Sequence, residues 1–217
     1  MTIRKQKSTN SPGPGRPTRL QAEQRNIELL EKALDLFLER GYSRTSIEGI
    51  AAEVGMAKRT VYAQFKDKKS LFKASLERAI DDWIVPIEAL QAVETNDFEE
   101  TLVRIGNLLV ENILTPKGMR LLRITNAESG SMHEISQYTY AKGTGPTLDY
   151  LANLFTRRGP DNIKPSQAAH AALAFMDLVV GGPGNMSAWG ISIDKSKIKR
   201  NTAYRVRLFL HGFFSFR

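Results

Sequence analysis

Apolar residues recur at helical spacing from about residue 20 to the end of the chain. The first such segment has apolar residues at i, i+3, i+7 and i+10, namely Ile27, Leu30, Leu34 and Phe37. This spacing predicts a helix with one buried side, and Gly41 ends it. The same pattern predicts a second helix over residues 46–55, a third over residues 57–65, and a longer fourth helix that begins after Asp67.

The rest of the chain follows the same period. One apolar stripe consists of Phe98, Leu102, Ile105, Leu109 and Ile113. Further helices are expected over residues 115–129 and 132–158, the second with a kink at "GTGP", residues 143–146, where proline interrupts the hydrogen bonding. "SQAAHAALAFMDLVV" and "NTAYRVRLFLHGFFSF" predict two more. Because no convincing period-2 strand and no internal repeat is present, the predicted fold class is all-α.

Positive charge is concentrated in the first third of the chain. Residues 1–75 hold 15 Lys and Arg against 8 Asp and Glu, whereas residues 76–217 hold 16 against 15. This asymmetry predicts a polyanionic partner for the first third only, with a solvated basic surface as the alternative. We divide the chain into a flexible basic arm (residues 1–19), a basic helical domain (20–75) and a larger, nearly neutral helical domain (76–217).

The arm contains five cations and no acid, and too few apolar side chains to offset the entropy of ordering. Its tripeptide "GRP", residues 15–17, is of the kind that lies in a narrow A·T-rich minor groove. The alternative is a tail that adds only nonspecific, salt-sensitive attraction to DNA.

The second and third predicted helices form a helix-turn-helix around Gly55. The apolar residues Ile50, Val54, Val61 and Phe65 are expected to fix the angle between the two helices. At 100° per residue, Arg59 and Ala63 then point furthest outward, flanked by Thr60 and Tyr62, with Lys58 near the start. This face predicts base contacts by Arg59 and Thr60 and phosphate contacts by Lys58 and Tyr62. The alternative is an ordinary helical hairpin with solvated charges.

The stretch "GYSRTSIEGIAAEVGMAKRTVYAQFKDKKSLF", residues 41–72, resembles the DNA-binding signature of TetR-type (tetracycline-repressor-like) transcriptional regulators. The resemblance implies phosphate contacts by Thr45 and Ser46, entry of residues 57–62 into the major groove, and a backbone contact by Lys68. The DNA-binding residues that we predict are Arg44, Thr45, Ser46, Ala57, Lys58, Arg59, Thr60, Tyr62 and Lys68.

Two positions depart from the family pattern. Ala57 stands where a serine often caps the third helix, so the capping hydroxyl is missing. Arg59 stands where a small residue is common, and we infer an extra contact to a base or phosphate from it.

The resemblance implies that the C-terminal domain dimerises and senses a ligand. "GMRLLRITNAES", residues 118–129, and "AAHAALAFMDLVVGG" are similar to the AefR-like subset of these domains. Small residues in the penultimate helix and large apolar residues in the last predict a four-helix dimer interface. The interface residues that we predict are Ala168, Ala171, Ala172, Val206, Phe209, Leu210 and Phe213. The alternative is a helix pair buried within one chain.

Candidate ligand-binding residues combine an apolar or aromatic body with a polar tip, or supply a polar group beside such a body. They are Trp83, Asn126, Glu128, Met132, His133, Tyr138 and Met176, and the alternative for each is an ordinary core position. His133, His170 and His211 lack metal-ligand spacing, and no catalytic triad, carboxylate pair or phosphate loop is evident. We therefore expect no metal, no cofactor and no enzyme activity.

The absence of cysteine suits a cytoplasmic protein, and no apolar run approaches the roughly 20 residues that span a membrane. Together these observations predict a dimeric repressor that binds a pseudo-palindromic DNA operator and is released by a small apolar effector. A small helical enzyme or carrier with a basic appendage would need a polar catalytic cluster in its C-terminal half. A nonspecific architectural DNA binder would not need a large, nearly neutral second domain.

Overall fold

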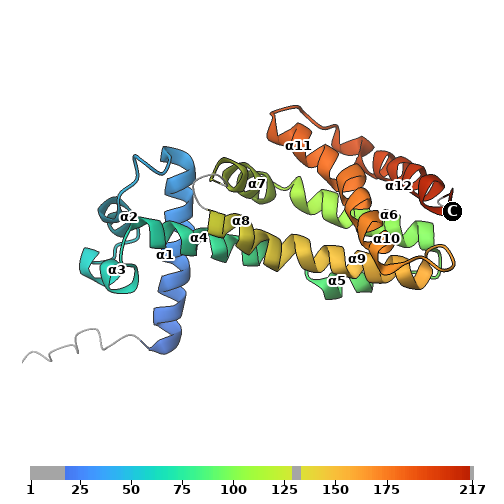
Figure 1. The fold of residues 1–217 in the computed structure, drawn as a ribbon. Helices are drawn as coiled ribbons and strands as arrows, with labels where there is room; N and C mark the ends of the chain where they lie inside the picture. The colour runs from blue at the N-terminus through green and yellow to red at the C-terminus, as the bar shows by residue number, and fades with distance from the viewer. Residues whose placement is uncertain (1–17, 129–132, 216–217) are drawn as a thin grey trace, which may run out of the picture. The chain divides into compact units, whose positions relative to one another are not determined.

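Every regular element in the described residues, 18–128 and 133–215, is a helix in the computed structural model (Figure 1). The predicted all-α class is confirmed. The arm, with its candidate minor-groove tripeptide, lies outside the described residues, as does Met132. The chain divides into two compact units, residues 1–72 and 73–217, and this division falls within α4 (Lys68–Trp83).

The first unit contains α1 (Arg19–Arg40), α2 (Ile47–Glu53) and α3 (Lys58–Gln64). At the start of α1, the Thr18 hydroxyl accepts a hydrogen bond from the Gln21 amide at 3.3 Å, and the Gln21 side chain accepts one from the Thr18 amide at 2.9 Å. This reciprocal pair satisfies two backbone donors that the helix leaves free.

Two glycines turn the chain of the first unit. Gly41 has a φ of 81° after α1, and Gly55 has a φ of 63° between α2 and α3. A side chain with a Cβ adopts such angles only at a cost, so both positions suit glycine. The predicted turn at Gly55 is present.

The core of the first unit joins all of its helices. Its buried side chains include Leu29, Ala33, Phe37, Ile47, Ile50, Val61, Leu71 and Phe72. The rings of Phe37 and Phe72 meet edge to face with centroids 4.8 Å apart, a geometry that aromatic pairs favour. Burial of these side chains holds the α2–α3 pair against α1.

The second unit continues through helices of varied length. They are α5 (Ile87–Ala92), α6 (Phe98–Ile113), α7 (Pro116–Glu128), α8 (His133–Thr139), η1 (Tyr140–Thr144), α9 (Gly145–Arg158), α10 (Pro165–Phe175), η2 (Met176–Gly181), α11 (Gly182–Ala188), η3 (Lys195–Lys197) and α12 (Ile198–Ser215). Residues 143–146, where we predicted a kink, span the junction between η1, a π-helical turn, and α9, and Pro146 stands in the first turn of α9.

The core of the second unit is rich in phenylalanine. Helix α12 packs against α6, and α10 packs against α9 (Figure 1). Phe155 on α9, Phe175 on α10, and Phe209 and Phe213 on α12 bring their rings together with contacting centroids 5.2–6.0 Å apart. All four side chains are buried.

This core contains most of the residues that we predicted at the dimer interface. Within a single chain, Ala171 is partly buried against the core, and the following residues are buried in it: Ala168, Ala172, Val206, Phe209, Leu210 and Phe213. They form the intramolecular helix pair that was the alternative. The assignment of the six buried residues to the dimer interface is corrected, because their side chains are already covered by their own subunit, whereas the interface role of the partly exposed Ala171 stays a prediction.

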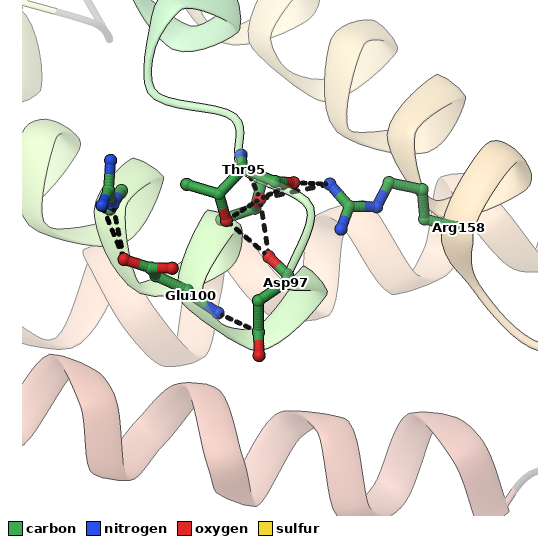
Figure 2. Close-up of polar contacts among 6 residues, drawn as sticks. Thr95, Asp97, Glu100 and Arg158 are labelled. Carbon is green, nitrogen blue, oxygen red and sulfur yellow. Dashed lines mark hydrogen bonds and ion pairs between the residues drawn. The ribbon is translucent and has the colours of Figure 1, made fainter.

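Arg158 ties the end of α9 to the loop before α6. Its guanidinium donates to the backbone oxygens of Thr95 and Asn96, both at 2.7 Å, and to the hydroxyl of the fully buried Thr101 at 3.2 Å. Figure 2 shows the Arg158 side chain reaching Thr95, beside the Asp97 carboxylate that caps α6 through the Glu100 amide at 2.8 Å. Charged donors of this kind fix the loop firmly.

Candidate nucleic-acid interface

Helix α3 has one buried residue and an otherwise exposed surface. Val61 is 0% exposed, and the other six residues of α3 are exposed. Ala57 is the N-cap residue of α3 and makes no side-chain hydrogen bond. As the sequence predicts, α3 therefore has no side-chain cap. One anchor and a polar outer surface are the arrangement that a groove-binding helix needs.

Arg59 and Thr60 lie on this exposed surface of α3. Within the described part of the chain, the Arg59 guanidinium has no hydrogen-bond or ion-pair partner. Its donors are therefore available to an external acceptor, and the base contact that we predict for Arg59 stays a prediction.

Lys58 and Tyr62, one turn apart on α3, both contact Glu48 on α2. The Lys58 ammonium lies 2.6 Å from Oε1 of Glu48, and the Tyr62 hydroxyl donates to the same oxygen at 3.1 Å. The hydrogen bond from Lys58 lowers the pKa of Glu48, and the hydrogen bonds to Glu48 raise the pKa values of Lys58 and Tyr62. Without DNA, the two predicted phosphate ligands are therefore held by an internal carboxylate.

Sequence reasoning missed Glu48. It precedes Lys58 by 10 residues and Tyr62 by 14, so no helical period connects them. On sequence alone, an acid in the first turn of a helix is explained by its favourable interaction with the helix dipole. Only the packing of α2 on α3 brings these three side chains together.

Ser46 and Thr45 precede α2 and differ in exposure. The Ser46 hydroxyl is exposed and accepts a hydrogen bond from the Gly49 amide at 3.1 Å, so its own proton remains available to a phosphate. Thr45 is 4% exposed, and its hydroxyl lies within hydrogen-bond distance of the Gly41 and Leu36 carbonyl oxygens, at 2.9 and 3.2 Å. The phosphate contact predicted for the Thr45 side chain is corrected, because this hydroxyl is used inside the fold.

Lys68 and Arg44 donate hydrogen bonds to backbone carbonyls at the end of α1 and in the loop that follows it. The Lys68 ammonium donates to the Tyr42 carbonyl at 2.9 Å and lies 4.4 Å from the centre of the Tyr42 ring. Arg44 donates to the Arg40 carbonyl at 2.8 Å through Nε, which leaves the outer nitrogens of its exposed guanidinium for other acceptors. Lys68 therefore supports the loop before α2, and phosphate contacts by both residues stay predictions.

Two of the predicted ligand-binding residues make polar contacts at the C-terminal end of α4. The Trp83 indole donates to the Asn112 carbonyl at 3.3 Å, and the Tyr138 hydroxyl donates to the Asp81 carboxylate at 2.8 Å. Burial, followed by this hydrogen bond, raises the pKa of Tyr138 to about 12. Both side chains thus tie helices of the second unit to the end of α4.

The other ligand candidates do not form a common site with these two. Asn126 and His133 are exposed, Met176 packs against the phenylalanine core, and the Glu128 side chain and Met132 lie outside the described residues. A groove of about 750 Å³ runs between α5 and α9 and is lined in part by Gln91, Glu94, Tyr150 and Arg157. None of the predicted ligand residues lines it.

Comparison with known families agrees with this arrangement. Residues 29–75 match "Bacterial regulatory proteins, tetR family", and residues 100–213 match "AefR-like transcriptional repressor, C-terminal domain". The chain belongs to the TetR family. It is a DNA-binding transcriptional regulator with an AefR-like C-terminal domain, and this family is one of regulators rather than enzymes.

Individual TetR-family members resemble it along most of their length. The transcriptional repressor ComR of Escherichia coli K12 is 25% identical over 76% of this chain and 80% of its own. A TetR-family regulator from Mesorhizobium loti superimposes with a TM-score of 0.74 at 24% identity, over 90% of this chain and 98% of its own. The flavonoid-responsive regulator FrrA gives a TM-score of 0.64 at 25% identity, over 87% and 97%.

The exposed side of the last helices carries apolar side chains in this TetR-family protein. Leu173 on α10 is 47% exposed, and Tyr204 and Leu208 on α12 are 68% and 53% exposed.

Among the described helices, none is long and apolar enough to cross a membrane. Within the described residues, no three His, Asp or Glu side chains lie close enough together to hold a metal ion.

Proposed function

We propose that this regulator is a dimeric repressor whose α3 helices enter two major grooves of a pseudo-palindromic operator. The observation that carries this proposal is the α3 surface, where Val61 is the single buried anchor and Arg59 has free donors. Arg59 then binds a guanine edge, Thr60 contacts a neighbouring base, and Ser46 binds phosphate at the start of α2. ComR is a repressor, and the matching C-terminal domain model describes AefR-like repressors, so both comparisons support repression rather than activation.

The proposed dimer interface is the exposed side of α10 and α12. Each helix buries one side in its own subunit and exposes large apolar side chains on the other, among them Leu173, Tyr204 and Leu208. Apolar side chains that share a surface favour association with a second copy. A fixed dimer would set the distance between the two α3 helices and therefore the spacing of the operator half-sites.

The proposed effector is a small, largely apolar molecule that binds the second unit. FrrA is described as flavonoid-responsive, which supports an aromatic effector class. The effector needs only to bind more tightly to the conformation in which the two α3 helices are wrongly spaced for DNA. A regulator that binds a DNA operator must reach the DNA of the cell, which supports a cytoplasmic location.

Selection of genomic DNA fragments by the full-length protein tests the proposal. Arg59→Ala should weaken binding to a selected fragment by about 1–3 kcal/mol and relax the preference at one base pair per half-site. Arg25→Ala is the matched control, because it removes an equal exposed charge from α1. Equal losses for Arg59→Ala on selected and random DNA would overturn the base contact.

A further inference from the structure

The two oxygens of the Glu48 carboxylate differ in their side-chain contacts. Lys58 and Tyr62 both contact Oε1, and the carboxylate also interacts with the backbone amide of Glu48 itself, whereas no other side chain among the described residues contacts Oε2. Glu48 is exposed, and so are both of its partners on α3. The two contacts, from side chains one helical turn apart, hold Oε1 against α3, and Oε2 keeps lone pairs for an external donor.

The negative charge of the Glu48 carboxylate is balanced by the neighbouring Lys58 ammonium. An isolated carboxylate on a DNA-binding surface would be repelled by phosphates. Here the Lys58 ammonium lies 2.6 Å from Oε1 and makes the pair neutral as a whole. Glu48 is therefore able to approach DNA without the full repulsion of an uncompensated anion.

The carboxylate lies beside the outermost strip of α3. Arg59 follows Lys58 by one residue, or 100° around the helix, so the Lys58–Tyr62 strip and the Arg59 strip are neighbours on one surface. A helix that presents Arg59 to the floor of a major groove thus brings the Glu48 carboxylate to the same groove. In that groove, the amino group of cytosine is the donor that a carboxylate accepts.

We propose that Glu48 is a specificity-determining residue that accepts a hydrogen bond from a cytosine N4 amino group through Oε2, with Lys58 and Tyr62 as positioning residues. This inference rests on the proposed placement of α3 in the major groove. Glu48 stabilises the complex when cytosine occupies that position, and it destabilises complexes with DNA that offers only phosphates. The two effects increase the difference in affinity between operator and random DNA.

The test uses full-length wild type, Glu48→Ala and Glu48→Gln with a library in which each position of a selected genomic fragment is varied. Wild type should prefer cytosine at one position per half-site, and Glu48→Ala should show no preference there. Glu48→Gln should change the preference toward adenine, because an amide both donates to N7 and accepts from N6 of that base. Retention of the wild-type cytosine preference by Glu48→Ala would overturn the inference.

Affinity supplies a second measurement with opposite signs on the two kinds of DNA. Glu48→Ala should weaken binding to the selected fragment by about 10-fold, the loss of one base contact. The same variant should tighten binding to a random duplex, with a salt slope steeper by about one, because Lys58 is released to a phosphate. Equal shifts in one direction on both duplexes would mean that Glu48 acts only through its charge.

Glu53→Gln is the matched control. Glu53 also lies on α2 and forms an exposed ion pair, with Arg40 at 2.9 Å. Its substitution removes the same charge and frees a different cation, so the cytosine preference should remain. Loss of that preference in Glu53→Gln would also overturn the inference.

The two variants Arg59→Ala and Glu48→Ala distinguish the proposed function from this inference. If both leave the base preferences unchanged, the placement of α3 in the major groove is wrong. If only Arg59→Ala changes a base preference, the placement stands and only the role of Glu48 is refuted.

Discussion

Trp83 and Asn112 exchange hydrogen bonds between the end of α4 and the end of α6. The Trp83 indole nitrogen donates to the Asn112 backbone oxygen at 3.3 Å, and the Asn112 side-chain amide donates to the Trp83 backbone oxygen at 3.0 Å. Each side chain thereby donates to a carbonyl near the end of the other helix, and the Asn112 oxygen also accepts from the Thr115 hydroxyl at 2.8 Å. Since both residues belong to the second unit, this pair fixes the end of α4 within that unit.

Gly118 on α7 adjoins this pair so closely that no side chain fits. A Cβ there would lie 2.6 Å from the Asn112 oxygen and 2.7 Å from the Trp83 indole nitrogen. Gly118→Ala should therefore lower the free energy of unfolding by about 1–3 kcal/mol, measured by denaturant titration. Gly182→Ala is the control, since a Cβ at that helical glycine meets nothing within 4 Å. Equal stability of Gly118→Ala and wild type would contradict this packing.

Arg158 and Arg157 are neighbours with different expected effects on stability. Arg158 donates to two backbone oxygens and a buried hydroxyl, whereas Arg157 makes one ion pair, with Glu94 at 3.2 Å, from a side chain that is 56% exposed. Arg158→Ala should cost about 1.5–3 kcal/mol, because it removes charged hydrogen bonds that fix the loop before α6. Arg157→Ala should cost less than about 1 kcal/mol. Urea melts of both variants check the contrast, and equal costs would refute it.

The raised pKa of Tyr138 predicts a loss of stability at alkaline pH. An unfolded tyrosine titrates near pH 10, whereas Tyr138 in the fold has a pKa of about 12 because of burial and its hydrogen bond to Asp81. Between these values the folded state binds more protons than the unfolded state, so the contribution is complete below pH 10 and is lost as the pH rises through 12. The melting temperature of Tyr138→Phe should therefore fall less steeply than that of wild type across this range.

Tyr140 is the control for this titration. Its side chain is 59% exposed, and Tyr140→Phe should follow the wild-type pH dependence. Identical alkaline profiles for wild type and Tyr138→Phe would show that the Tyr138–Asp81 contact does not persist in solution.

The helices and their order follow from local features of the sequence, whereas the orientation of the last helix does not. Gly55 and the apolar spacing of α2 and α3 are enough to predict the helix-turn-helix, because each is a short-range constraint. Around α12, however, the sequence has apolar residues on more than one side, including Val206, Phe209, Leu208 and Tyr204. Periodicity alone cannot decide which side covers the subunit's own core, since packing by α6 and α10 makes that choice.

The final prediction separates the two sides of α12. Leu208 is 53% exposed and Phe209 is 8% exposed, although they are adjacent in sequence. Leu208→Glu should leave the subunit folded, because its carboxylate reaches water, but it should separate the proposed dimer and weaken operator binding while salt-sensitive binding to random DNA remains.

Phe209→Glu should instead destabilise the subunit by several kcal/mol, because it places an unpaired carboxylate among the rings of Phe155, Phe175 and Phe213. Sedimentation velocity with circular dichroism distinguishes a folded monomer from an unfolded chain. Leu20→Glu, at a residue 77% exposed on α1, introduces the same charge away from α12 and should leave the sedimentation coefficient unchanged. A Leu208→Glu protein that sediments with wild type as a dimer would remove this side of α12 from the interface. Phe209→Glu would in that case still report on the core, because its effect requires no partner.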